Sequence, residues 1–93
     1  MTLETKPYDP ALFLRDDTII HGYLQDAYDS GEPGRFLLAL RNVAQVKGVT
    51  QLSESSGLGR QSLYKTLSEN AHPRWETIQK ILIALDVKIQ FAA

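Results

Sequence analysis

The sequence predicts an all-α domain of five to six short helices, closed at its C-terminal end by a single β-strand. Apolar residues recur every three or four positions in separate segments, which is the spacing of helices with one buried face. Glycine and proline lie between those segments, where helices have to end. The 93 residues include no cysteine and no apolar run of about 20 residues, so a disulfide scaffold and a membrane span are excluded. We expect one domain over residues 1–93.

The first helices belong to an acidic N-terminal part, residues 1–35. Asp9 and Pro10 predict the start of a short helix, because Asp is a good N-cap and Pro fits the first helical position. Asp16 or Asp17 then caps a second helix. Its apolar stripe consists of Ile19, Ile20, Tyr23, Leu24, Ala27 and Tyr28. This part holds seven acidic and three basic residues, a net charge of −4 in a chain whose net charge is −1.

A core of helices is predicted over residues 36–86, after a loop at residues 30–34. The third helix ends before Gly48, and its apolar stripe consists of Phe36, Leu37, Leu40, Val43 and Ala44. Thr50 predicts the cap of a fourth helix of about two turns, which ends at Gly57 because glycine tolerates the left-handed conformation. Residues 36–80 hold six basic and three acidic residues, a net charge of +3.

The last predicted elements are two helices and a strand. Leu63 and Leu67 mark a short helix, and a loop closed by Pro73 follows. The final helix carries an apolar stripe of Ile78, Ile81, Leu82 and Leu85. Alternation then places Val87, Ile89 and Phe91 on one face of a strand over residues 87–93. Because an isolated strand is not stable in water, its expected partner is a second copy, so these three residues are the predicted dimer contact.

Residues 50–67 have the pattern of a helix-turn-helix, in which two short helices are joined by a tight glycine turn. Four leucines would lock the helices together: Leu52, Leu58, Leu63 and Leu67. Arg can pair with guanine and Gln with adenine in the major groove, while polar residues opening the preceding helix can hold a phosphate. The predicted DNA-binding residues are Thr50, Gln51, Arg60, Gln61, Ser62, Tyr64 and Lys65.

The run over residues 48–68, which ends Leu-Tyr-Lys-Thr-Leu-Ser, resembles the lambda-repressor-like (Cro/C1-type) helix-turn-helix. More narrowly, it is similar to the HigA-related family of addiction-module antidote proteins. The Pro-Arg-Trp-Glu-Thr segment at residues 73–77 and the Ala-Leu-Asp ending at residues 84–86 extend the resemblance. Ser53, Gly59 and Asp86 depart from the family pattern, which has Ala, Ser and Gly there.

The resemblance implies the antitoxin of a type II toxin–antitoxin module in the cytoplasm. Such a protein neutralises its cognate toxin, typically a RelE/HigB-like mRNA endonuclease, by direct binding. It also represses its own operon by binding an inverted repeat in double-stranded DNA as a homodimer. Since a toxin that handles RNA should be basic, the acidic residues 1–35 are the expected toxin-facing part.

Two other readings stay open: a stand-alone transcriptional regulator without a toxin, and an interaction module without DNA affinity, which the weak net charge leaves possible. We expect no enzyme, cofactor or metal site. His21 and His72 have no nucleophile motif and are not spaced as metal ligands; a surface and a loop position are expected. Trp75 is expected in the core rather than stacked on a base. Tyr64 either packs on the DNA backbone or tucks beneath the turn.

Overall fold

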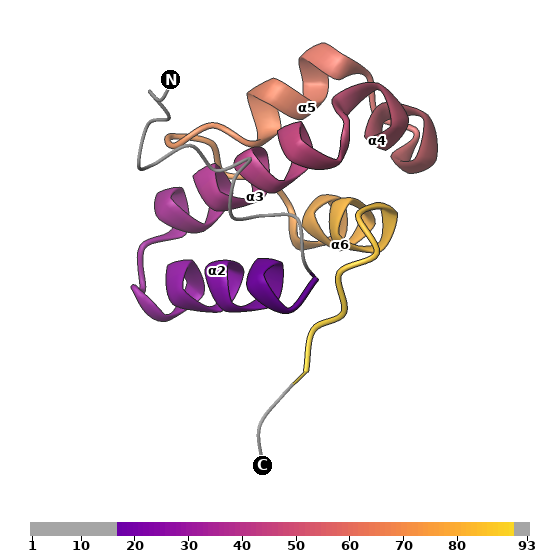
Figure 1. Ribbon diagram of the computed structural model, residues 1–93. Helices are drawn as coiled ribbons and strands as arrows, with labels where there is room; N and C mark the ends of the chain where they lie inside the picture. The colour runs from indigo at the N-terminus through magenta and orange to yellow at the C-terminus, as the bar shows by residue number, and fades with distance from the viewer. Residues whose placement is uncertain (1–16, 91–93) are drawn as a thin grey trace, which may run out of the picture.

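The computed structural model describes residues 17–90, which form five α-helices and no strand (Figure 1). The helices are α2 (Asp17–Asp29), α3 (Pro33–Lys47), α4 (Val49–Ser56), α5 (Arg60–Thr66) and α6 (Trp75–Ala84). The all-α prediction is therefore confirmed for this part of the chain. The helix predicted from Asp9 and Pro10 lies outside the described residues.

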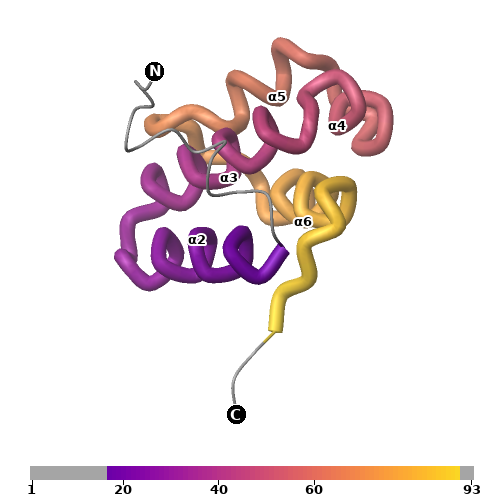
Figure 2. The backbone as a smooth tube through the Cα atoms, in the orientation of Figure 1, coloured from indigo at the N-terminus to yellow at the C-terminus, as the bar shows by residue number. Residues whose placement is uncertain are grey.

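The α3 helix is the element around which the others pack. It contacts α2 along one side and α4 near its C-terminal end, and α4 in turn contacts both α5 and α6. The tube view shows α2 and the α4–α5 pair on opposite sides of α3 (Figure 2). The buried side chains of residues 17–90 are all apolar, and Leu40, Val43 and Ile81 among them have no exposed surface.

The predicted apolar stripes of α2 and α3 meet at one interface. Ile20, Leu24 and Ala27 of α2 are buried, whereas Ile19 and Tyr28 of the same predicted stripe are exposed. Two side-chain pairs join the helices at the edge of this interface. The Asn42 amide donates a hydrogen bond to the Tyr23 hydroxyl at 2.7 Å, and the Tyr28 and Phe36 rings meet edge to face at 5.9 Å.

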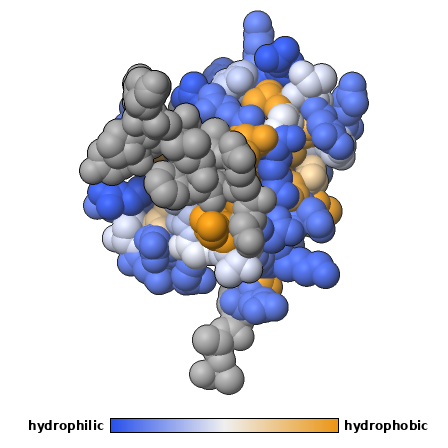
Figure 3. Space-filling view, in the orientation of Figure 1, coloured by the Kyte–Doolittle hydropathy of each residue, from blue (hydrophilic) through white to orange (hydrophobic). Residues whose placement is uncertain are grey.

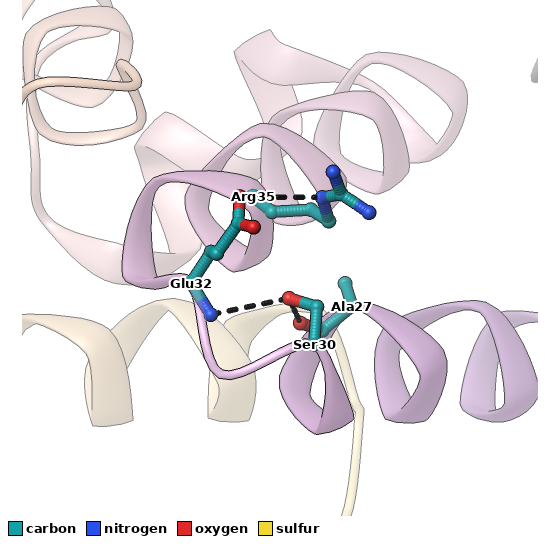
Figure 4. Close-up of polar contacts among 4 residues, drawn as sticks. All are labelled: Ala27, Ser30, Glu32 and Arg35. Atoms are coloured by element: carbon teal, nitrogen blue, oxygen red, sulfur yellow. Dashed lines mark hydrogen bonds and ion pairs between the residues drawn. The ribbon is translucent and has the colours of Figure 1, made fainter.

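The loop between α2 and α3 is shorter than the predicted residues 30–34. Pro33 occupies the first turn of α3, where its missing N–H costs nothing, and Gly34 follows inside the helix. The close-up in Figure 4 shows the Ser30 hydroxyl donating to the Ala27 carbonyl at 2.6 Å and accepting from the Glu32 N–H at 3.2 Å. These bonds satisfy backbone groups that the end of α2 and the start of α3 leave unpaired.

Gly34 is needed for a close approach rather than for a turn. A Cβ atom at this position would lie 2.6 Å from the backbone carbonyl oxygen of Glu69, in the loop after α5. The N-terminal end of α3 therefore touches a loop that is 35 positions away in sequence.

Two predictions about helix starts are wrong. Thr50 is not the cap of α4: Gly48 takes that position, and Thr50 lies inside the first turn. Trp75 is not a core residue, because it opens α6 with 59% of its surface exposed. The predicted end of α4 is confirmed, since Gly57 adopts the left-handed conformation with φ of 77°.

The segment after α6 forms no strand over residues 87–90 of the described chain, and Phe91 lies outside it. The Val87 N–H donates to the Leu82 carbonyl at 2.9 Å, which turns the chain away from the helix. Val87 is half-buried and Ile89 is 46% exposed. Pairing with a second copy stays a prediction. In the part of the chain that the structure describes, no helix has the length and apolar character of a membrane span.

Candidate nucleic-acid interface

The α4–α5 pair is joined by a three-residue connection, residues 57–59, which the side chains of α4 hold in place. The Ser53 hydroxyl donates a hydrogen bond to the Leu58 carbonyl at 2.6 Å, across the turn. The Leu58 N–H donates in turn to the Ser56 hydroxyl at 3.2 Å. Both hydrogen bonds therefore join the C-terminal part of α4 to Leu58, in the middle of the connection.

Packing fixes the angle between the two helices. Leu52, Leu63 and Leu67 are buried in the common core, and Leu58 in the connection is half-buried against it. The four leucines predicted to lock the pair therefore do contact the core. Since α4 also packs on α3 and α6, the pair is attached to the body of the domain through α4.

The predicted DNA-binding residues are on the surface of this pair. Thr50 and Gln51 are exposed in the first turn of α4. On α5 the exposed side chains are those of Arg60, Gln61, Ser62 and Lys65. The structure thus brings six of the seven predicted residues to the surface on two adjacent helices, with donor and acceptor groups available to a partner.

The two cations of α5 are not neutralised within the described chain. The ion pairs found among residues 17–90 are Arg35 with Glu32 and Lys47 with Asp17, each at 3.7 Å. Arg60 and Lys65 make no such pair, so their charge is available to an anionic partner. On the face seen in Figure 3, hydrophilic residues predominate and hydrophobic ones reach the surface in small patches.

Tyr64 differs from the other six residues because it is half-buried. Its ring also contacts a side chain of another helix. The guanidinium carbon of Arg41, on α3, lies 5.3 Å from the centre of the Tyr64 ring. The ring is therefore neither buried beneath the turn nor wholly open to a partner. Sequence reasoning missed Arg41, since nothing in the spacing of residues 41 and 64 indicates that they meet.

The two histidines of the described chain lie on its surface. His21 is exposed on α2, and His72 is exposed in the loop before α6, as predicted. Residues 17–90 contain no group of three or more histidine, aspartate or glutamate side chains placed to hold a metal ion. A shallow hollow between the start of α2 and the segment after α6 is lined by acidic, basic and apolar residues alike, among them Asp17, Asp86 and Lys88.

The chain is similar to a known protein family and to one bacterial protein over almost its whole length. A family model described as "Probable addiction module antidote protein" matches residues 4–93. An uncharacterized protein of Haemophilus influenzae is 30% identical over 90 residues, which cover 97% of this chain and 93% of that protein. No solved structure matches the chain.

Proposed function

The chain belongs to the family of probable addiction module antidote proteins, and from this premise we propose that it is the antitoxin of a type II toxin–antitoxin module. An antidote implies a cognate toxin. In this proposal the toxin is RelE/HigB-like and is neutralised by direct contact. The antitoxin also represses its own operon by sequence-specific DNA binding through a helix-turn-helix formed by α4 and α5.

The observation that carries the DNA-binding part is the exposure of Arg60 and Gln61 in the first turn of α5. In a helix-turn-helix, the second helix enters the major groove with its N-terminal residues nearest the base edges. Arg60 would donate two hydrogen bonds to a guanine, and Gln61 would pair with an adenine. Lys65, one turn further along, would contact a backbone phosphate, as would Thr50 and Gln51 at the start of α4.

The rigid connection between the helices supports this role. A reading helix has to present its side chains at a fixed angle, because a shift of a fraction of an ångström weakens paired hydrogen bonds to bases. The Ser53–Leu58 and Leu58–Ser56 hydrogen bonds hold residues 57–59 in one conformation. The reading helix α5 begins directly after that connection, with Gly59 as its N-cap.

The part proposed to face the toxin is residues 1–35, and within the described chain its acidic side chains lie on α2 and the turn after it. Asp26, Asp29 and Glu32 are exposed there. The α2 helix lies on the far side of α3 from the α4–α5 pair (Figure 1). A basic toxin would be attracted to this side electrostatically, whereas DNA would be repelled from it.

The proposed DNA-binding form is a homodimer. Two copies of α5 would read the two halves of an inverted repeat about one helical turn apart. Val87, Ile89 and Phe91 are the proposed contact between copies. The exposure of Ile89 supports this, because 46% of a large apolar residue is left uncovered within the described chain.

The test is binding of the purified protein to the DNA upstream of its own gene and to a scrambled duplex of equal length and composition, across a salt titration. Tighter binding to the upstream duplex is the expected result for a repressor that reads bases. Equal weak binding to both duplexes, or none to either, would contradict sequence-specific repression by this protein. Capture of the product of a neighbouring gene for a small basic protein tests the toxin part separately.

A further inference from the structure

The three cations of α3 are in different electrostatic situations. Arg35 Nε lies 3.7 Å from a carboxylate oxygen of Glu32, and Lys47 Nζ lies 3.7 Å from one of Asp17. Arg41 has no carboxylate partner within residues 17–90. Its guanidinium lies instead over the ring of Tyr64, with its carbon 5.3 Å from the ring centre. Arg41 is therefore the cation of α3 whose charge the described chain does not neutralise.

The surroundings of Arg41 leave its hydrogen-bonding capacity unused. The residue is half-buried, and no carboxylate among residues 17–90 forms an ion pair with its guanidinium. An aromatic face attracts the cation, but a guanidinium carries five N–H donors in its own plane, and no described residue accepts a hydrogen bond from them. Those donors remain available to an anion with several acceptor oxygens.

The Tyr64 contact also fixes where this cation is. An arginine side chain free in solvent has many rotamers, and ordering it on binding costs free energy. Stacking on a ring restricts the guanidinium before a ligand arrives. Tyr64 lies on α5 between the buried Leu63 and the exposed Lys65. Arg41 belongs to α3, but its contact with Tyr64 places its charge beside the proposed reading helix.

We propose that Arg41, held on the Tyr64 ring, binds a phosphate group of the DNA backbone and extends the DNA-binding surface from the α4–α5 pair onto α3. The inference rests on the proposed DNA-binding function. A planar guanidinium matches the oxygens of a phosphate with two parallel hydrogen bonds. Since phosphates carry no sequence information, Arg41 contributes to affinity and orientation rather than to the choice of bases.

The test measures binding of labelled duplexes by fluorescence anisotropy, with the upstream and the scrambled DNA, over a series of salt concentrations. Arg41→Gln is expected to weaken binding to both duplexes by the same factor. It should also reduce the slope of log affinity against log salt by about 1, the value for one lost phosphate contact. The matched control is Arg35→Gln, which removes the same charge from the same helix and should leave the slope unchanged.

Variants of the ring test whether Tyr64 positions Arg41. Tyr64→Phe keeps the aromatic face and should therefore lose much less affinity for both duplexes than Tyr64→Leu does. Tyr64→Leu removes the face and should weaken binding to both duplexes. Adding Arg41→Gln to Tyr64→Leu should then cost less than it costs in the wild type, because the two residues act together. Arg41→Lys retains the charge and is expected to keep the wild-type salt slope; thermal unfolding of each variant checks that it folds.

The outcomes separate this inference from the function on which it rests. If the wild type binds neither duplex, both fail. If the wild type binds but Arg41→Gln keeps the affinity and slope of Arg35→Gln, the Arg41 site is wrong while DNA binding stands. Loss of affinity for the upstream duplex alone would show that Arg41 reads bases, which also overturns the phosphate assignment.

Discussion

At the scale of single residues, Arg60 and Lys65 are exposed on the same short helix and carry the same charge, yet we assign them different tasks. A base contact and a phosphate contact differ in what their loss does to specificity. Arg60→Ala should cost about 1–3 kcal/mol against the cognate site and relax base preference there. Lys65→Ala should weaken binding to all duplexes alike and flatten the salt dependence. Equal losses on cognate and scrambled DNA for Arg60→Ala would remove its base-reading role.

Gly34 and Gly22 give a matched pair of glycines inside helices. Alanine normally stabilises a helix interior by about 1 kcal/mol relative to glycine. At Gly22 nothing lies within 4 Å of the added Cβ, so Gly22→Ala should raise the melting temperature. At Gly34 the added Cβ would meet the Glu69 carbonyl at 2.6 Å, and a backbone atom cannot move aside as a side chain can. Gly34→Ala should therefore destabilise by about 1–3 kcal/mol.

Thermal unfolding followed by circular dichroism measures both glycine variants. For a domain of this size, each 1 kcal/mol shifts the melting temperature by roughly 4–8 °C, so opposite shifts for the two variants are resolvable. A stabilising effect of Gly34→Ala would show that the loop containing Glu69 is free to move away from α3.

At the scale of elements, the sequence predicts helices well where an apolar stripe exists. The stripes ending at Ala44 and at Leu85 correspond to α3 and α6, since burial of one face is what forms such helices. Two of the errors fall at helix starts, where local rules compete. Thr50 satisfies the rule for a cap, but Gly48 lies two residues earlier and takes the position. Trp75 is apolar, but its place at the first position of α6 turns it to solvent.

The sequence predicts those features of the candidate site that depend on residues close together in the sequence. Six of its seven residues are exposed because they occupy positions on α4 and α5 that the four leucines leave outward. The Arg41–Tyr64 pair could not be predicted, because it depends on how α3 and α5 sit in the fold rather than on spacing. The Glu69 contact of Gly34 escaped prediction for the same reason.

The α2 helix determines how the toxin-facing side has to be tested. Deleting residues 1–30 is the obvious experiment, but Ile20, Leu24 and Ala27 are part of the core, so the deletion would unfold the domain. Substitution of exposed acids avoids this. Asp26→Lys with Asp29→Lys should weaken binding to the toxin at least tenfold at low salt, and less at high salt, because the attraction is electrostatic.

The control for the α2 substitutions is Glu76→Lys, which changes an exposed acid at the start of α6. Titration calorimetry with the purified toxin from the neighbouring gene measures the affinity of each variant. Compared as single variants, Asp26→Lys, Asp29→Lys and Glu76→Lys each change the net charge by the same amount. If all three weaken toxin binding equally, only net charge matters and the acidic side of α2 is not the docking face.

At the scale of the whole molecule, the remaining prediction concerns assembly. Ile89→Lys places a charge at the proposed dimer contact, where burying it without a partner is costly, so the variant should sediment as a monomer. Ile19→Lys is the control, since Ile19 is also 46% exposed but lies on α2. Analytical ultracentrifugation distinguishes the two states; a dimer that survives Ile89→Lys would exclude pairing through residues 87–91.

Charge is unevenly distributed over the molecule. The α2 helix, which carries exposed acids, lies across α3 from α5 (Figure 2), whose cations form no ion pair within residues 17–90. A nucleic acid and a basic protein are attracted to different sides of such a domain, so both can be bound at once without competing for the same residues. The α3 helix touches both sides, with Tyr28 against Phe36 at one end and Arg41 against Tyr64 further along.

The exposed position of Trp75 gives the protein a built-in optical reporter. It is the only tryptophan in the chain. Fluorescence excited at the red edge of the indole absorption band therefore reports on one place, the start of α6. An indole in water emits at long wavelength, and covering it shifts the emission toward the blue. The unlabelled wild-type protein can therefore show directly whether an added partner covers the start of α6 or leaves it in contact with water.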